Sequence, residues 1–375
     1  MFKILTLNKI SQVGLSQLTN NYVVSDDEAN PEAILLRSFK MHDMELPDSL
    51  LAVARCGAGV NNIPLDKCAD KGVVVFNTPG ANANAVKELV LTAMLISSRD
   101  IMGSYKWAQS LQGQEGIAAS VEKGKANFAG PEIKGKTLGI VGLGAIGILV
   151  ANAAVSLGMK VIGYDPFLSV NNAMCLDPAV KYTTDINDIY ALSDYITVHV
   201  PATKETTNMI NEETLAKCKD GIRIINLARN ELVNSDAIKA GIKSGKVSCY
   251  VTDFPNEETV GVDNIITLPH LGASTPEAED NCAEMAAVQM MEYLENGNIV
   301  NSVNYPSCSA PRISNTKRVC VLHSASSEVA AAITGASQLV AQVRGNYGYT
   351  IADTNTIDVD KIKAVAGVIS VRVLD

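Results

Sequence analysis

Three side chains with complementary chemistry each come soon after a segment that is predicted to be a strand. They are Arg229, Glu257 and His270. Ligands bind at the carboxyl ends of strands in open α/β sheets, so we expect the three to gather there. A histidine suits proton transfer at an oxygen, a nearby carboxylate favours the charged imidazolium, and an arginine can bind a substrate carboxylate with two hydrogen bonds. The set predicts a catalytic site for hydride transfer between a nucleotide and a carbonyl compound.

The nucleotide would bind to a glycine-rich turn upstream of these residues. Gly142, Gly144 and Gly147 have the spacing G-x-G-x-x-G between an apolar strand and an apolar helix. The first glycine permits a tight turn, the second lets a pyrophosphate approach the backbone, and the third lets the helix pack closely. Asp165 ends the next strand and would bind the adenosine ribose, which favours NAD over NADP. The predicted contacts of this region are Gly142, Gly144, Ala145, Ile146, Gly147 and Asp165.

An alternation of strands and helices must position these residues, and it predicts an α/β protein with a doubly wound parallel sheet. Residues 1–97 read as a first small α/β domain, and residues 98–284 as the nucleotide-binding domain. The chain is expected to return to the first domain at about 285–308. The strands are predicted at 2–7, 33–38, 50–57, 73–78, 138–141, 160–164, 195–199, 222–227, 247–251 and 265–268, and the helices at 11–19, 64–71, 81–102, 146–157, 185–192, 211–217, 235–243 and 275–296.

A linker at 309–316 precedes a final unit at 317–375. Its pattern predicts a small α+β domain that carries no catalytic group. The predicted strands cover 317–323, 349–355 and 368–374, and the predicted helices cover 328–343 and 358–365.

Composition restricts the class of partner and the compartment. The chain of 375 residues has a formal net charge of −9, which argues against nucleic acid as its main partner. No apolar run is long enough for a membrane span, and the first residues read as a strand rather than a secretory signal. The eight cysteines are scattered without a C-x-x-C pair, which favours reduced thiols in the cytoplasm. No metal site is predicted.

Several motifs resemble those of the D-isomer-specific 2-hydroxyacid dehydrogenases. They are GLGAIG, YITVHVPATKETTNMI, INLARNELVN, LPHLGAST, RCGAGVNNI and VVVFNTPGANANAVKEL, and the resemblance covers nearly the whole chain. It implies a Rossmann domain that binds NAD, a flavodoxin-like substrate domain, and catalytic roles for Arg229, Glu257 and His270. It also implies further cofactor contacts at His199, Pro201, Leu227, Ala228, Asp253, Gly272 and Ala273.

The same resemblance implies a phosphorylated 2-hydroxy acid as substrate. The loop Gly57, Ala58, Gly59 and Val60 would bind the substrate carboxylate through its N–H groups. Arg37 and Arg55 would meet a phosphate, with Lys40 a weaker candidate nearby. An acidic protein needs such clustered cations to hold a substrate with about three negative charges. The implied reaction is the NAD-dependent oxidation of 3-phosphoglycerate to 3-phosphohydroxypyruvate, the first step of L-serine biosynthesis.

The chain departs from the family pattern at several positions. Asn230 follows the arginine where the family often has glycine, and Asp253 is shifted by one residue from the aspartate expected at the nicotinamide amide. The C-terminal unit resembles an ACT domain, in which His323 stands at an effector position. Ala325 replaces the asparagine expected there, which argues against feedback by serine and favours a role in assembly.

Two other functions fit the same motifs. One is a glyoxylate or hydroxypyruvate reductase of the same family, and the other is a nucleotide-sensing binding protein like the corepressors that share this fold. The polar, glycine-containing segment 103–136 is either an arm that packs on a second subunit or local packing. We expect a homodimer or homotetramer.

Overall fold

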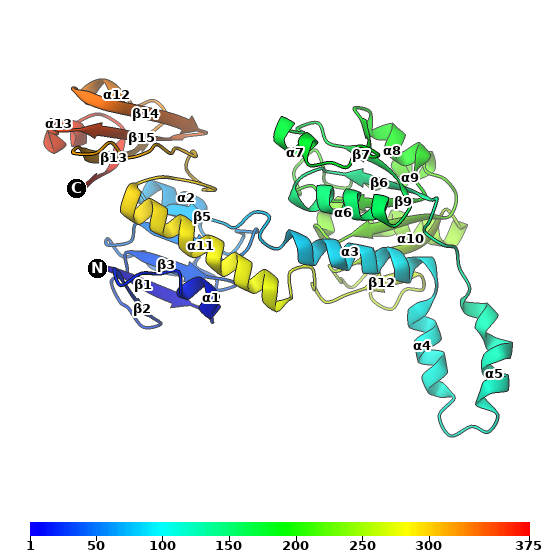
Figure 1. Cartoon of the computed structure of the whole chain (residues 1–375). Coiled ribbons are helices and arrows are strands. Elements are labelled where there is room, and N and C mark those ends of the chain that lie inside the picture. The colour runs from blue at the N-terminus through cyan, green and yellow to red at the C-terminus, as the bar shows by residue number, and fades with distance from the viewer. The chain divides into compact units, whose positions relative to one another are not determined.

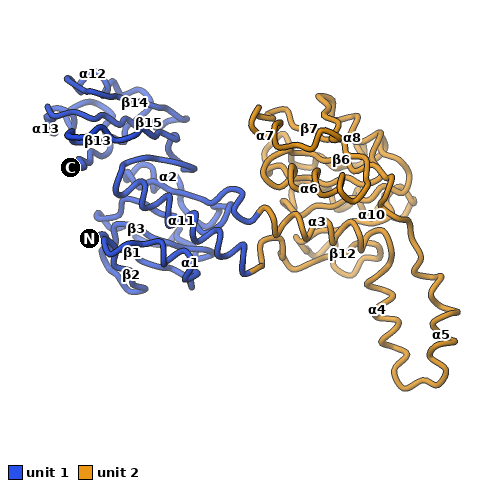
Figure 2. Tube along the Cα trace, viewed as in Figure 1, with its two compact units in different colours: residues 1–82, 276–375 blue, residues 83–275 orange.

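The computed structural model describes all 375 residues, which divide into two compact units. Residues 1–82 and 276–375 form the first unit, and residues 83–275 form the second (Figure 2). The first boundary between the units lies after residue 82, whereas the sequence predicted it after residue 97. The difference is one helix, α3 (Ala83–Ser98). This helix belongs to the second unit because it packs on α6 and on strands β10 and β11 of that unit.

The first unit contains a five-stranded parallel sheet in the order β2-β1-β3-β4-β5, which is the flavodoxin-like order (Figure 1). The central strand β3 is buried along its whole length, as its continuous apolar sequence requires in a parallel sheet. The long helix α11 packs on this sheet. The elements are β1 (Phe2–Leu7), α1 (Gln12–Leu15), β2 (Tyr22–Ser25), β3 (Ala33–Leu36), β4 (Ala52–Arg55), α2 (Leu65–Asp70), β5 (Val74–Phe76) and α11 (Pro276–Asn296).

The C-terminal part of the first unit has the element order β-α-β-β-α-β. Its four antiparallel strands are arranged β14-β15-β13-β16, the split βαβ order. The predicted helix at 328–343 is wrong, because only α12 (Val329–Ala332) is helical and β14 (Ala336–Arg344) pairs with β15 along its length. The other elements are β13 (Lys317–Ser324), β15 (Tyr347–Thr354), α13 (Val359–Lys363) and β16 (Val368–Leu374).

The second unit contains a seven-stranded parallel sheet in the order β12-β11-β10-β9-β6-β7-β8. The strand order reverses between β6 and β9, so these two strands flank the topological switch point where nucleotides bind in such sheets. The elements of the sheet layer are β6 (Thr137–Val141), α6 (Ala145–Ser156), β7 (Lys160–Tyr164), α7 (Val170–Met174), β8 (Lys181–Thr183), α8 (Ile186–Leu192), β9 (Tyr195–Val198), α9 (Glu212–Lys217), β10 (Ile222–Asn226), η2 (Asn230–Leu232), α10 (Ser235–Ser244), β11 (Val247–Thr252) and β12 (Ile265–Thr267).

A pair of helices projects from this sheet layer (Figure 1). The pair consists of α4 (Ile101–Ser110) and α5 (Ile117–Gly124), followed by η1 (Lys125–Phe128), and neither α4 nor α5 buries a residue. The helix predicted at 81–102 therefore ends early. Asp100 starts α4 instead, because its side chain accepts a hydrogen bond from Gly103 N at 2.8 Å and caps the new helix.

Candidate active site

The three glycines of the turn after β6 differ in the space that a side chain would have. Gly142 has a φ of +95°, and a Cβ there would lie 2.7 Å from the carbonyl oxygen of His199. A Cβ on Gly147 would lie 2.0 Å from the carbonyl oxygen of Gly142, so the helix packs directly on the turn. Around Gly144, the first residue before α6, a Cβ would meet nothing within 4 Å. The turn is therefore tight on the protein side and open where a pyrophosphate would approach.

Asp165, which follows β7, is held against this turn by backbone hydrogen bonds. Its Oδ2 accepts from Leu143 N at 2.8 Å, and its Oδ1 accepts from Phe167 N at 2.9 Å. The carboxylate is only partly buried, so its remaining lone pairs are available to ribose hydroxyls. Together with the N–H groups at the start of α6, these residues fit an NAD molecule with its pyrophosphate at the helix N-terminus.

His199 lies at the switch point, after β9. Its Nε2 is 3.1 Å from Thr197 Oγ1, whereas its Nδ1 is buried without a hydrogen-bond partner. Burial lowers the pKa of His199 to about 4, so the ring is neutral at physiological pH. Pro201 is exposed two residues further on. An unpartnered ring nitrogen in a predicted cofactor site is an available contact for a polar group.

Arg229 is presented by a turn that one buried side chain holds. Asn226, the last residue of β10, is fully buried, and its Oδ1 accepts from Ala228 N at 3.2 Å and from Arg229 N at 3.3 Å. Its Nδ2 donates to the carbonyl oxygen of Arg229 at 2.7 Å. The guanidinium is exposed and makes one hydrogen bond, to the carbonyl oxygen of Ala228. The sequence analysis missed Asn226, although an asparagine that ends a buried strand three residues before an arginine was the available signal.

Asp253 is the buried carboxylate of this site. It follows β11 and is 1% exposed, its Oδ2 accepts from Gly272 N at 3.1 Å, and its Oδ1 has no partner. Burial raises the pKa of Asp253, and the Gly272 N–H and the charges of His270 and Arg229 lower it only in part. The three ionisable side chains therefore share one electrostatic environment at the carboxyl ends of β10, β11 and β12.

His270 follows β12 in the left-handed region, with a φ of +51°. Its backbone N–H donates to the carbonyl oxygen of Asp253 at 3.0 Å, and its ring packs on Phe254 with the centroids 4.8 Å apart. A side chain in this conformation requires support from its surroundings, and these two contacts supply it. The imidazole is exposed, so a substrate can reach it.

Glu257 is exposed, and no hydrogen bond or ion pair joins it to His270 in this structure. Its loop is tied to the arginine turn instead, because Asn256 Nδ2 donates to Asn230 Oδ1 at 3.0 Å. The carboxylate of Asp253 is the one whose pKa responds to the charge of His270 here.

The predicted anion-binding residues of the first unit lie after β3 and β4. Arg55 Nε donates to the carbonyl oxygen of Arg37 at 3.1 Å, so the two arginines are neighbours. Arg37 forms an ion pair with Glu279 of α11, with Nη2 and Oε1 2.7 Å apart. The loop at 57–60 is fixed by Thr78 N, which donates to the carbonyl oxygen of Gly57 at 3.1 Å, and by Asn77 Nδ2, which donates to that of Ala58 at 2.7 Å.

His323, the predicted effector residue, is buried in β13 with both ring nitrogens engaged. Nδ1 is 2.8 Å from the carbonyl oxygen of Ser324, and Nε2 is 3.0 Å from Thr350 Oγ1. This side chain therefore contributes to packing within the four-stranded sheet.

Comparison with known proteins gives a consistent family. Residues 91–272 match the D-isomer specific 2-hydroxyacid dehydrogenase, NAD binding domain, so the cofactor is NAD. The D-3-phosphoglycerate dehydrogenase of Homo sapiens is 33% identical over 82% of this chain and 58% of its own length. That of Archaeoglobus fulgidus is 35% identical over 74% of this chain and 52% of its own length. This chain thus spans little more than half the length of these relatives.

The fold agrees with solved structures. The holo form of D-mandelate dehydrogenase from Rhodotorula graminis superposes with a TM-score of 0.67 at 23% identity, over 83% of this chain and 99% of that one. No helix of the structure has the length and apolar character needed to cross a membrane. By their match to the family model, residues 91–272 are an NAD-binding domain of the D-isomer-specific 2-hydroxyacid dehydrogenase family.

Proposed function

We propose that this protein oxidises 3-phospho-D-glycerate to 3-phosphohydroxypyruvate with NAD, the first step of L-serine biosynthesis. The observation that carries the proposal is the shared electrostatic environment of Arg229, Asp253 and His270 at the edge of the sheet that also bears the glycine turn. The names of the human and archaeal relatives support the choice of substrate.

In the direction of oxidation, bound NAD would supply the acceptor for the hydride from C2 of the substrate. His270 takes the proton of the C2 hydroxyl, so that the C2–O bond becomes a carbonyl. Arg229 binds the carboxylate and stabilises the developing charge on the C2 oxygen. Asp253 stabilises the imidazolium through its charge, and its half-satisfied carboxylate is also a contact for the nicotinamide amide. We assign Glu257 to a contact with His270 that forms when the substrate binds.

The remaining assignments concern the rest of the cofactor and the substrate. The turn at 142–147 and Asp165 hold the pyrophosphate and the ribose, and the residues at 199–201, 227–228 and 272–273 line the nicotinamide. The N–H groups of 57–60 bind the substrate carboxylate, and Arg37 and Arg55 bind its phosphate.

Assembly and compartment complete the proposal. We assign the α4–α5 pair to a subunit interface of a homodimer or homotetramer, because Met102 and Tyr105 are exposed apolar side chains on a projection without a core. The β-α-β-β-α-β order supports an ACT-like role for the C-terminal part. All eight cysteines are free thiols, which supports a cytoplasmic location.

The test is a steady-state assay that follows NAD reduction with 3-phosphoglycerate and with unphosphorylated D-glycerate. We expect kcat/KM to be at least a hundredfold higher for the phosphorylated acid, because only its phosphate can bind Arg37 and Arg55. His270→Gln should lower kcat about a thousandfold, whereas the surface substitution Lys3→Gln should leave it unchanged. Equal efficiency with both acids would remove phosphoglycerate as the substrate and would favour the reductase of unphosphorylated acids.

A further inference from the structure

One buried side chain of α11 differs in chemistry from the others that this helix buries. Gln289 is 6% exposed and carries a carboxamide. The other buried residues of the helix are four alanines, a cysteine, a methionine, a tyrosine and a leucine. Taking a carboxamide out of water costs free energy that a methionine of similar size would avoid. Packing alone therefore does not explain a glutamine at this position.

Only half of this carboxamide has a hydrogen-bond partner. Nε2 of Gln289 donates to the carbonyl oxygen of Asn77, the residue after β5, at 3.0 Å. Its Oε1 is buried and has no partner. A buried acceptor without a donor lowers the stability of the folded state. Such a cost is typical of residues that serve a functional site.

The segment that Gln289 holds is the one to which the loop at 57–60 is attached. Nδ2 of Asn77 donates to the carbonyl oxygen of Ala58 at 2.7 Å, and Thr78 N donates to that of Gly57 at 3.1 Å. Both donors come from the two residues that directly follow β5. A shift of this short segment would therefore move the loop with it.

These two bonds also set the direction of N–H groups in the loop. The carbonyl group of Gly57 shares a planar peptide unit with the N–H of Ala58, and the carbonyl group of Ala58 shares one with the N–H of Gly59. Fixing each carbonyl oxygen therefore fixes the N–H group on the opposite side of the same plane. The orientation of both N–H groups thus depends on where Asn77 and Thr78 lie.

We propose that Gln289 is a positioning residue for recognition of the substrate carboxylate. Through the backbone of Asn77 it sets the orientation of the N–H groups of Ala58 and Gly59. This inference rests on the proposed function, which assigns the N–H groups of this loop to the carboxylate. It adds a residue of α11 that touches neither substrate nor cofactor.

The experiment replaces Gln289 by methionine in the full chain and measures steady-state kinetics. We expect Gln289→Met to raise KM for 3-phosphoglycerate about tenfold, because the hydrogen bonds to the carboxylate lose their alignment. The same bonds act in the ground state and in the transition state, so kcat should fall less than threefold. KM for NAD should stay unchanged. Tm should stay within about 3 °C, because methionine fills the same space and removes the unpartnered oxygen.

Three further measurements distinguish positioning from a general effect on folding. Both acids carry the carboxylate, so KM for D-glycerate should rise by the same factor. Asn281→Ala is the matched control, because exposed Asn281 of the same helix bonds the carbonyl oxygen of Ala81, at 3.4 Å, and not the segment that holds the loop. It should change KM less than twofold. In an Asn77→Ala background, Gln289→Met should raise KM by less than a further threefold.

Two results would overturn the inference. One is a wild-type KM for both acids in Gln289→Met. The other is a lower Tm together with equal increases of KM for NAD and for the acids, which would assign Gln289 to folding.

Failure of the proposed function would give a different result. If the wild type has the higher kcat/KM for an unphosphorylated acid, the function is wrong, and a tenfold rise of KM for that acid in Gln289→Met would keep the positioning role. If the wild type prefers 3-phosphoglycerate and Gln289→Met binds it with the wild-type KM, the function stands and the positioning role is wrong.

Discussion

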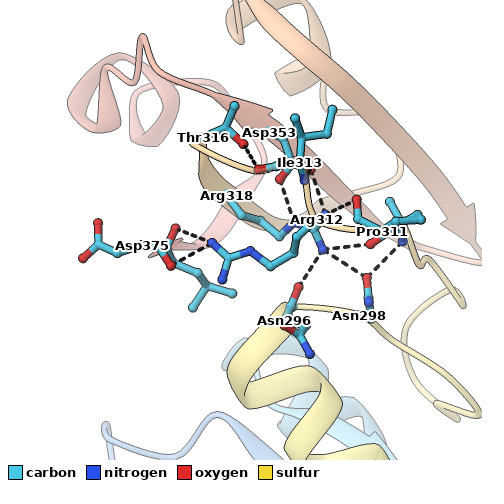
Figure 3. A network of polar contacts seen from close by, with 12 residues as sticks. Asn296, Asn298, Pro311, Arg312, Ile313, Thr316, Arg318, Asp353 and Asp375 are labelled. Atoms are coloured by element: carbon cyan, nitrogen blue, oxygen red, sulfur yellow. Dashed lines mark hydrogen bonds and ion pairs between the residues drawn. The ribbon is translucent and has the colours of Figure 1, made fainter.

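Asp353 in the C-terminal part of the first unit and Asp253 in the second unit are the same residue type with the same exposure, 1% in each case. Their environments differ in how well the carboxylate is satisfied. Asp353 receives both Nε and Nη2 of Arg318, at 2.7 and 2.8 Å, and the backbone N–H of Ile313 (Figure 3). Asp253 receives one hydrogen bond, and its second oxygen has none.

The pKa values of the two carboxyls follow from this difference. Burial raises the pKa of Asp353, but the hydrogen bonds and charge of Arg318 outweigh it and hold the pKa below its ordinary value. Burial also raises the pKa of Asp253, and here the surrounding donors and charges do not overcome it. A fully satisfied buried carboxylate holds the fold together, whereas a half-satisfied one marks a site where a ligand completes the hydrogen bonding.

The Arg318 network has a structural role that extends beyond the pair. Its Nη1 donates to the carbonyl oxygens of Asn296, at the end of α11, and of Ala310, at 2.8 and 3.0 Å, and its Nη2 donates to that of Pro311 at 2.9 Å (Figure 3). A cation at the carboxyl end of a helix also interacts favourably with the helix dipole. This one side chain therefore joins the four-stranded sheet to the end of α11.

The largest expected effect comes from removing the partner of Asp353, the carboxylate whose two oxygens both have hydrogen bonds. Arg318→Met leaves Asp353 charged, buried and without its partner, which should lower the free energy of unfolding by about 3–5 kcal/mol. Chemical denaturation followed by circular dichroism measures the loss. Activity per folded molecule should change less than twofold, because no substrate or cofactor contact is assigned to this network.

The matched control replaces both partners. Arg318→Met combined with Asp353→Leu removes the stranded charge and should recover at least half of the lost stability. A double variant that is less stable than Arg318→Met alone would show that the backbone contacts of Arg318, rather than its pairing with Asp353, hold this region.

His199 is a second side chain of the second unit whose hydrogen bonding is incomplete, because Nε2 has a partner and the buried Nδ1 has none. Its pKa in the folded protein is about 4, below its ordinary value of 6.5, so the folded state binds fewer protons than the unfolded state between these values. The stability that depends on neutral His199 is therefore complete above pH 6.5 and is lost as the pH falls toward 4, by about 3 kcal/mol in all. His199→Gln should abolish this loss of stability when the free energy of unfolding is measured by denaturation between pH 6.5 and pH 4. Identical pH dependence of the variant and the wild type would contradict a buried neutral ring.

The fold was largely predictable where the secondary structure that the local sequence favours is also the one that the tertiary structure requires. The glycine turn, Asp165 and the strands of the second sheet follow from apolar runs and punctuating glycines, since each sequence feature serves the element that contains it. β14 was not predictable in this way. Its residues 336–344 favour a helix locally, and only the antiparallel ladder to β15 makes them a strand.

The sequence assigns residue types to the candidate site, but it does not specify which of these side chains contact one another. A carboxylate near His270 follows from the chemistry, yet sequence favoured Glu257, because the family motif places a glutamate in that loop. The structure brings the charge of Asp253 to His270, through backbone contacts that span residues 253 and 270. Contacts of this kind depend on the alignment of β11 with β12, which no local pattern encodes.

The side-chain oxygen and nitrogen of Asn226 both have hydrogen-bond partners, yet this residue holds the turn that carries Arg229. It therefore tests whether complete hydrogen bonding by itself implies a purely structural role. Asn226→Ala frees the turn that presents Arg229 and should lower kcat/KM for 3-phosphoglycerate about thirtyfold, with NAD affinity changed less than threefold. Asn234→Ala is the matched control, because Asn234 caps α10 through Ala237 N at 2.9 Å and has no contact with Arg229.

A double-mutant cycle identifies the route of the effect. If Asn226 acts by positioning Arg229, Asn226→Ala should cost little further activity in an Arg229→Ala background. Additive losses in the double variant would mean that Asn226 affects activity independently of the arginine.

The smallest expected effect comes from neutralising the half-satisfied carboxylate, and it has opposite signs for stability and activity. Because the pKa of Asp253 is raised in the folded state, its charge costs stability once the pH exceeds the ordinary aspartate range. Asp253→Asn should therefore stabilise the protein at pH 7 by about 1 kcal/mol and raise Tm by about 2–4 °C. The same change removes the negative charge that interacts with His270, so kcat/KM should fall about tenfold. Asp353→Asn, the matched change in the satisfied pair, should instead lower Tm, because it weakens the partner of Arg318 without relieving a cost. If both variants lost stability, incomplete hydrogen bonding would not distinguish a functional buried carboxylate from a structural one in this protein.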